Sequence, residues 1–467
     1  MAISRRDLLQ LTAVGGLAAL ARTPWALAQA PSTAPAQAPS AVPAAPIEPN
    51  DRVFIANEDS STITVVDPRA NTVDTTINLT SFDEDPRPPF RFATGGVVPT
   101  HAAMTARPLY RGAIDVHGLV PSPDGRWLAA TARGSSNVYL IDTLTKKVLG
   151  GGPNPQAVPS TNPERVSSGI LVGREPHEAT FTRNGKELWA AVRGEDRIAI
   201  IDVTAALKES GGGLTRAVRG VLQTINGPSR VWFSTDGGLA FIASQKTSTM
   251  AVLAMNPDAD GFSRPSGRAL LNISAQDPVG FTSFLKTSPD GAEVWLSHKL
   301  ADRVSTWDAR EPFRVLDGVA LGQQARPNHL EFVENARGKA VYVSLARVED
   351  GGPGDVASSR IAIIDRAARP GSRRVASTFF THGREAHGLW TNPAHTLLYV
   401  AHEQDELPGT PNAGQTVASA FDVTHPFVPV FVAQIPLGEL ALPSGRLRNK
   451  KSIDLVYVRP GARSQTG

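Results

Sequence analysis

Cysteine is absent from this chain of 467 residues. Disulfides, thiolate nucleophiles, iron–sulfur clusters, blue-copper sites and c-type haem attachment all require cysteine, so the sequence excludes them. Three other signatures are missing: the Gly-x-Ser-x-Gly elbow, the phosphate-binding loop and the glycine-rich dinucleotide fingerprint. An enzyme class therefore has to be argued from other residues.

An excess of one charge and long apolar runs are also absent. The net charge is +3, but residues 1–30 hold Arg5, Arg6 and Arg22 against Asp7 alone, so removing this +2 leaves +1. Without a basic excess, we do not expect binding to a nucleic acid. No apolar run beyond residue 30 is long enough to span a bilayer, so no integral membrane segment is expected once residues 1–30 are removed.

The first thirty residues have the composition of an export signal. A charged start, an apolar middle and the small residues Ala28 and Ala30 are typical of a secretory signal peptide. The stretch from Ser4 to Leu9, Ser-Arg-Arg-Asp-Leu-Leu, resembles the twin-arginine signal, which implies export of a folded protein, often with its cofactor inside. An ordinary secretory signal that carries two arginines is the alternative. We expect a periplasmic or secreted protein, exported by the twin-arginine route.

The rest of the chain divides into a linker and one repetitive domain. Residues 31–50 are rich in proline and alanine and are expected to be extended or disordered. Residues 51–467 repeat one unit, clearest at 117–150: a strand, a Ser-Pro-Asp-Gly turn and three further strands, the third ending in Ile-Asp. Further copies begin near residues 177, 229, 283, 329 and 387.

A seventh copy is split between the two ends of this domain. Residues 51–79 contain strands two to four but no first strand, and residues 452–461 supply an isolated strand. Joining them closes a ring, which leaves only short and protected sheet edges. The sequence therefore predicts an all-β fold, a seven-bladed β-propeller of four-stranded antiparallel blades that the C-terminal strand closes. A β-solenoid, which needs no split blade, is the alternative.

Two segments, FIANEDSSTITVVD and ATARGSSNVYLID, resemble the YVTN repeat family of β-propellers. The resemblance covers nearly all of the chain after the predicted linker and implies the propeller fold. Relatives of that architecture include lactonases, the d1-haem domain of nitrite reductase, nitrous oxide reductase and many binding proteins, so the fold leaves the function open. A lactonase is expected to carry carboxylates at the rim, and Glu175, Glu178 and Glu385 lie near it in the sequence.

Histidine recurs at the start of the first strand in four of the repeats. Aligned on the glycine of the first turn, His117, His177 and His387 occupy one position, and His329 lies one residue away from it. Because first strands line the channel of a propeller, we expect these four side chains at the rim of one channel mouth. Neutral imidazole is a common ligand for copper, zinc or iron, so the four form a candidate metal or ligand site.

Arginine accompanies three of these histidines. Arg174, Arg326 and Arg384 each stand three residues before a histidine, and a guanidinium suits carboxylate or phosphate, so they are candidate anion-binding residues. Residues 80–115 and 151–175 are far longer than the usual connection of about 4–6 residues and are expected to cover the mouth. Candidate lid contacts are His101, Arg107, Tyr110 and Arg111.

The histidines also have an architectural interpretation. In this interpretation the histidines were inherited from one ancestral repeat, and each forms a hydrogen bond to a neighbouring strand and binds no ligand. Ser229 and Ser283 at the same position show that the fold does not require histidine there, and packing does not explain the arginines. His298 and His402 end second strands and are expected to be partly exposed without a ligand role.

Two functions follow from this pattern. The first is a periplasmic binding protein whose His/Arg mouth holds a small anionic ligand or a metal. The second is a metal-dependent enzyme that uses the same histidines, either an oxidoreductase or a lactonase or lyase with a metal-activated water. A protein partner is a further expectation.

Overall fold

The computed structural model describes residues 46–79, 114–149, 169–208, 217–273, 281–442 and 445–462. The predicted export signal and residues 31–45 of the predicted linker lie outside the described residues. So do most of the two long connections and the lid candidates His101, Arg107, Tyr110 and Arg111. All described residues belong to one compact unit, residues 44–467.

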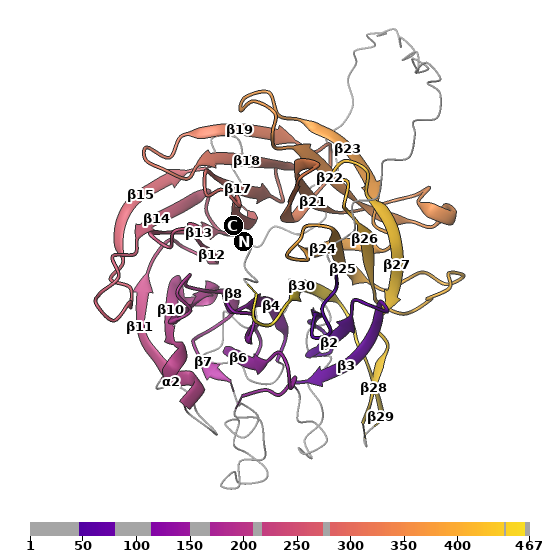
Figure 1. Ribbon diagram of the computed structural model, residues 1–467, viewed down its shortest axis with the longest axis horizontal. Coiled ribbons are helices and arrows are strands. Elements are labelled where there is room, and N and C mark those ends of the chain that lie inside the picture. Colours follow the sequence, from indigo (N-terminus) through magenta and orange to yellow (C-terminus); the bar gives the residue numbers. More distant parts are fainter. Residues whose placement is uncertain are drawn as a thin grey trace, which may run out of the picture. The chain divides into compact units, whose positions relative to one another are not determined.

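Seven four-stranded antiparallel sheets form this unit, and Figure 1 shows them as blades around a common centre. This confirms the predicted seven-bladed propeller and excludes the solenoid. The described residues contain a single short α-helix, α2 (Val203–Lys208), and two 3₁₀ turns, η2 (Arg193–Glu195) and η4 (Pro353–Asp355). No helix of this described part is long and apolar enough to cross a bilayer.

The blades are described here from the inner strand outward. The first contains β30 (Ser452–Val458), β1 (Arg52–Asn57), β2 (Thr62–Asp67) and β3 (Thr72–Asn78). The second contains β4 (Val116–Pro121), β5 (Trp127–Ala132), β6 (Asn137–Asp142) and β7 (Ile170–Leu171). The third contains β8 (Pro176–Phe181), β9 (Glu187–Val192), β10 (Arg197–Asp202) and β11 (Val218–Gln223). The fourth contains β12 (Pro228–Phe233), β13 (Leu239–Ser244), β14 (Thr249–Ala254) and β15 (Ser266–Asn272).

The remaining blades follow the same order. The fifth contains β16 (Thr282–Thr287), β17 (Glu293–His298), β18 (Arg303–Asp308) and β19 (Val315–Ala320). The sixth contains β20 (Pro327–Asn335), β21 (Gly338–Glu349), β22 (Ser358–Asp365) and β23 (Val375–Phe380). The seventh contains β24 (Arg384–Thr391), β25 (Leu397–Gln404), β26 (Val417–Asp422) and β27 (Val430–Pro436), and a hairpin of β28 (Glu439–Leu442) and β29 (Gly445–Arg448) follows it.

The C-terminal strand closes the ring as the sequence predicts. β30 pairs antiparallel with β1, and Leu455 lies opposite Ile55 in this register. The seven inner strands contact one another in cyclic order, and β30 lies between β24 and β4. The inner strands therefore converge on one axis, which brings residues far apart in the sequence into a single channel.

The recurring Ser-x-Asp-Gly turn explains why the repeat is visible in the sequence. Ser122 donates its hydroxyl to Asp124 at 2.5 Å, and the next residue, Gly125, has a positive φ of 67°. Glycine adopts this left-handed conformation without the steric cost that a Cβ brings. The turns that start at Ser234 and Ser288 repeat this geometry.

Aromatic side chains pack between neighbouring blades. Trp189 is fully buried and meets Phe233 of the next blade edge-on, with ring centroids 5.4 Å apart. Trp295 packs against Phe332 in the same way at 6.4 Å. Such contacts are typical of stabilising aromatic pairs.

Replacing Leu455 with alanine should lower the free energy of unfolding by about 2–5 kcal/mol, because it empties a fully buried site in the closing strand. Urea unfolding followed by circular dichroism measures the loss. Val430→Ala is the matched control on outer strand β27, where the side chain is 56% exposed, and it should stay within about 0.5 kcal/mol of the parent. Equal losses in the two variants would contradict this account of closure.

Candidate functional site

The predicted histidines all lie where an inner strand starts and its pairing is irregular. In four blades the pairing of the first strand with the second is interrupted over two residues, as between Val116 and Leu119. Such bulges re-aim side chains and are frequent beside functional sites. The interruptions contain His117, His177, His329 and His387.

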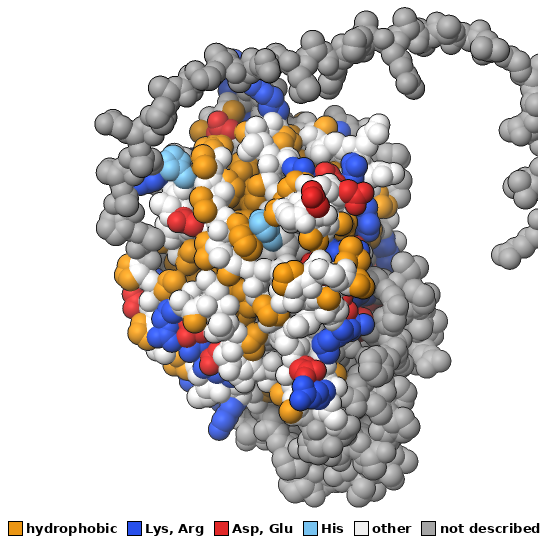
Figure 2. Space-filling model, turned by 90° about the vertical axis from the view of Figure 1, so that its right-hand side faces the viewer, with side chains coloured by type: hydrophobic (Ala, Val, Ile, Leu, Met, Phe, Trp, Pro, Cys, Tyr) orange, Lys and Arg blue, Asp and Glu red, His pale blue; other side chains and the backbone are white. Residues whose placement is uncertain are grey.

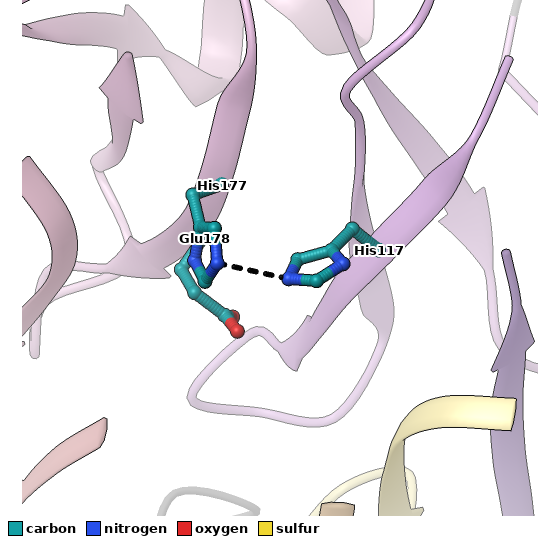
Figure 3. A group of neighbouring side chains, drawn as sticks. All are labelled: His117, His177 and Glu178. Carbon is teal, nitrogen blue, oxygen red and sulfur yellow. Dashed lines mark hydrogen bonds between the residues drawn. The ribbon is translucent and has the colours of Figure 1, made fainter. Parts of the chain in front are cut away.

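Two of these histidines meet directly. Nε2 of His117 lies 3.1 Å from Nε2 of His177, and the ring centroids are 4.3 Å apart. Figure 3 shows the two imidazoles reaching toward each other from neighbouring inner strands. Both side chains are buried, with 4% and 6% of their surface exposed.

The other nitrogen of each ring faces an acceptor. Nδ1 of His117 lies 3.3 Å from Oε1 of Glu58. Nδ1 of His177 lies 3.1 Å from the carbonyl oxygen of Ser229. Nη1 of Arg133 is also 3.3 Å from Nδ1 of His117; it carries two hydrogens and can donate both there and to Glu58, which it contacts at 2.5 Å. Two tautomers of His117 therefore fit. With the proton on Nε2, His117 donates to Nε2 of His177; with the proton on Nδ1, both Nε2 atoms carry lone pairs that can bind one cation.

One amide competes for this position. Nε2 of Gln245 lies 3.1 Å from Nε2 of His177. Arg193 donates to the oxygen of the same amide, which orients its NH₂ group toward the imidazole. Any ion between the two histidines must therefore displace this donor.

A carboxyl group completes a cluster of three possible metal ligands. One oxygen of Glu178 and one nitrogen each of His117 and His177 all lie within 4.8 Å of one another. The carboxyl fits beside Gly118, because a Cβ at that glycine would lie 2.3 Å from Oε2 of Glu178. Burial raises the pKa of Glu178 to about 8, although Arg230 lies 3.0 Å away and opposes the shift.

The other two predicted histidines form a second pair. The rings of His329 and His387 are 4.7 Å apart. Nδ1 of His329 lies 3.5 Å from Asp454, and Nε2 of His387 lies 3.6 Å from Glu403. A charge on His387 would lower the pKa of His117, so the two pairs share one electrostatic environment.

Burial keeps the imidazoles of His117, His329 and His387 neutral. Desolvation is the largest cause that lowers the pKa of His117 to about 3, and the charge of Arg133 adds to it. The pKa of His329 and that of His387 also lie well below the usual range, chiefly because of burial. A neutral imidazole has the lone pair that a metal requires.

A ring of polar side chains around the histidines was not expected from the sequence. Five of its members directly follow the second strand of their blades, and Glu403, at the same offset in the repeat, lies within β25 next to its last residue. Their sequence signal is a polar residue after an apolar stretch, as in IANE at residues 55–58 and AVR at residues 191–193. Only an alignment of the second strands would reveal this signal. The members of the ring are Glu58, Arg133, Arg193, Gln245, Lys299 and Glu403.

The three predicted anion-binding arginines have protein partners. Arg174 lies 3.6 Å from Glu195, and Arg326 lies 3.7 Å from Glu385. Arg384 donates to the carbonyl oxygen of Asp405 at 2.8 Å. These contacts tie the segments before the inner strands to nearby turns and side chains, and the anion-binding role stays a prediction.

The architectural interpretation also finds support. Nδ1 of His177 contacts the backbone of the next blade, as Ser283 does through its hydroxyl, which donates to Pro327 at 2.8 Å. In the sixth blade the strand register gives the equivalent position to Asn328, which donates to Ala386 of the seventh blade. This bonding accounts for one nitrogen of His177, and a hydrogen bond from Nε2–H of His117 would account for the other.

The prediction of partial exposure for His298 and His402 was wrong. Their side chains are 2% and 0% exposed. His298 contacts the hydroxyl of Ser305 at 2.7 Å, and His402 contacts the carbonyl of Val417 at 3.0 Å. Strand ends are usually near solvent, but in this fold the ends of second strands lie beside the channel.

Deeper in the inner strands, an ion pair fills the space between aromatic rings. Nζ of Lys286 contacts both oxygens of Glu331, at 2.9 and 2.8 Å, and both side chains are fully buried. The ammonium also lies 4.0 Å from the ring centroid of Trp390 and 5.3 Å from that of Trp232. Cation–π contacts of this kind are strong when water is excluded.

Comparisons with known proteins support the fold and point to one family. A family model described as Lactonase, 7-bladed beta-propeller, matches residues 171–345, a segment that contains His177 and Glu178. A search of curated proteins found no match.

Solved structures resemble this chain in fold. A putative 6-phosphogluconolactonase from Bacteroides uniformis is 14% identical, with 87% of this chain and 99% of that chain covered and a TM-score of 0.55. A second, from Bacteroides fragilis, is 13% identical over 88% and 99%, with a TM-score of 0.54. A functionally unknown protein from Desulfotomaculum acetoxidans is 10% identical over 88% and 99%, with a TM-score of 0.53. At these identities the likeness shows the fold alone.

Lys286→Met should destabilise the protein by about 3–5 kcal/mol, because it leaves Glu331 buried without its partner charge. The double variant Lys286→Met/Glu331→Leu should lose less than the single variant, since neither charge then remains. Chemical unfolding of the parent, both single variants and the double variant measures the coupling. Additive losses would show that the pair is not coupled.

Proposed function

We propose that this propeller binds a divalent metal ion in its channel through His117, His177 and Glu178 and uses the ion to hold a small anionic ligand. The observation that carries the proposal is the 3.1 Å contact between the two Nε2 atoms, with both Nδ1 atoms facing acceptors. Histidines that ligate metals nearly always direct the second nitrogen to a carboxylate or a backbone carbonyl. Both of those arrangements occur here.

The distance between the nitrogens suits a shared ion. Bonds of about 2.05 Å from one metal to two nitrogens separate them by about 2.9 Å at a right angle and about 3.3 Å at the tetrahedral angle. The separation of 3.1 Å lies between these limits. A cation beside Glu178 also favours the ionised carboxylate, which offsets the effect of burial on that group.

Two imidazoles and one carboxylate leave coordination positions free for a ligand. Zinc accepts this donor set in catalytic sites, and so does non-haem iron. Arg133 and Arg193 lie in the polar ring beside the two histidines, where they pair with Glu58 and Glu175, so the positive charge available to an anion is that of the metal itself. A carboxylate that binds the metal therefore suits this site better than a neutral molecule of the same size.

The apo-protein should bind about one Zn²⁺ per chain, and His177→Ala should abolish this binding because it removes a ligand. Isothermal titration calorimetry measures the stoichiometry, and visible absorption of the Co²⁺ form reports the coordination. His387→Ala is the matched control, since His387 occupies the equivalent position in another blade and lies outside the proposed ligand set. Stoichiometric metal in His177→Ala would overturn the proposal, and so would a parent chain that binds none.

A second variant tests the carboxylate without removing any ligand. Gly118→Ala places a methyl group where the Glu178 carboxyl lies. It should weaken Zn²⁺ binding about 10–100-fold, as changes in the support of a metal ligand commonly do. Unchanged affinity in a folded Gly118→Ala protein would remove Glu178 from the ligand set.

Metal-assisted hydrolysis of a lactone is a second candidate function. It is favoured by the match of the lactonase family model to residues 171–345. His117, His177 and Glu178 would hold the metal, which would supply polarisation of the carbonyl and activation of a water. The water oxygen would bond to the carbonyl carbon, and the ring carbon–oxygen bond would break to give a hydroxy acid. The oxidoreductase alternative stays a prediction.

Metal-loaded protein should hydrolyse a sugar lactone, and His177→Ala should lose at least about 100-fold in rate because the metal is lost. A pH-stat records the acid that is released. Protein treated with chelator is the control for spontaneous opening of the ring. If the chain binds zinc but opens no lactone above this background, the result would support metal binding and contradict lactone hydrolysis.

A further inference from the structure

A cavity of about 280 Å³ opens between the sixth and seventh blades, away from the histidine cluster. Its lining comes from four segments: the loop between β21 and β22, the segment before β24, the loop between β25 and β26, and the outer strand β27. Figure 2 faces the side of the molecule on which β27 lies, and hydrophobic side chains spread across it. The volume is close to the lower end of the range for small-molecule sites, about 300–1,000 Å³.

One wall of this cavity is aromatic. The imidazole of His382 stacks on the ring of Phe431, with centroids 3.6 Å apart and planes 9° from parallel. Val356 and Pro411 add apolar surface from the two loops. Phe431 is 38% exposed although it is a large apolar residue, so the wall has surface free to cover a ligand.

A carboxyl group is buried in the lining. Glu406 is 4% exposed, and among the described residues its Oε1 has no hydrogen-bond partner. Its backbone is fixed on both sides, since its N–H donates to Gln415 and its carbonyl accepts from Gly414, both at 2.9 Å. A buried acceptor without a donor destabilises the protein, and a ligand that donates a hydrogen bond to it removes this cost.

The charges around Glu406 are partly engaged, although Nε of Arg384 has no hydrogen-bond partner among the described residues. Arg384 donates to the Asp405 carbonyl at 2.8 Å, and the Asp405 carboxylate pairs with Arg448 at 2.8 Å. Burial raises the pKa of Glu406; the charge of Arg384 opposes the shift and that of Asp405 adds to it. A donor that reaches Oε1 therefore meets an acceptor that these ion pairs leave available.

We propose that this cavity binds a small organic ammonium ion with a flat apolar body, whose N–H groups donate to Glu406 and whose body packs against Phe431 and His382. An ammonium supplies donors for Oε1 and adds its positive charge to that of Arg384, and aromatic faces attract cations as well as apolar groups. This site is separate from the proposed metal site at His117, His177 and Glu178, and the proposal for it does not depend on metal binding there.

Phenethylammonium is the probe, and isothermal titration calorimetry at neutral pH is the measurement. The parent protein should bind it more tightly than phenylacetate or 2-phenylethanol, which have similar bodies but no positive charge. Glu406→Gln should weaken binding at least about tenfold, and Phe431→Leu should weaken it while keeping the apolar volume. Asp355→Asn is the matched control, because it removes an exposed carboxylate from one of the two loops and should leave binding unchanged.

Three results would overturn the proposal: equal affinity for phenylacetate, unchanged affinity in Glu406→Gln, or equal loss in Asp355→Asn. Thermal unfolding checks that each variant is folded. If Glu406→Gln does not fold, the NMR shift of the His382 imidazole in the parent protein decides, because bound probe must perturb it and absent binding leaves it unchanged. Zinc content of the same variants should not change, which separates this test from that of the metal site.

Discussion

The pairing of β30 with β1 is the contact on which the rest of this structure depends. It joins the two ends of the domain through buried residues such as Ile55 and Leu455, and it fixes the seven inner strands around one axis. Seven strands that converge in this way bring their first residues into a volume too small for water to solvate every side chain. The polar groups there must then satisfy one another or bind something.

The channel shows both outcomes. At the second position of the inner strands, Ser283 and Asn328 bond the backbone of the next blade, and one nitrogen of His177 does the same. A histidine differs from these residues because it has a second nitrogen on the far side of the ring. When neighbouring blades both carry histidine there, as with His117 and His177, the second nitrogens meet, and they can either share a hydrogen bond or bind one cation.

The fold was predictable because its signals are local, whereas much of the site was not. Turns such as Ser122 to Gly125 recur with one geometry, so they mark the repeats and the split blade. Aligning on those turns found the histidines and left His329 one residue away from the shared position, which the strand register gives to Asn328. The ion pairs of Glu58 with Arg133 depend on contacts between blades, and such contacts have no short-range pattern in the sequence.

Glycine and carboxylate at neighbouring positions show how such a repeat becomes specialised. In the second and seventh blades the residue after the histidine is glycine, and in each case a carboxyl of the adjacent blade, Glu178 or Asp454, fills the space that a Cβ would take. Both carboxyls have a raised pKa because they are buried. A glycine that only shaped the backbone would not need an acidic neighbour, so the channel keeps these two acids next to histidines at a cost in stability. Arg230 lies 3.0 Å from Glu178, and its charge opposes the rise in the pKa of both acids, so a buried guanidinium already offsets part of this cost; the proposed metal would offset more of it at Glu178.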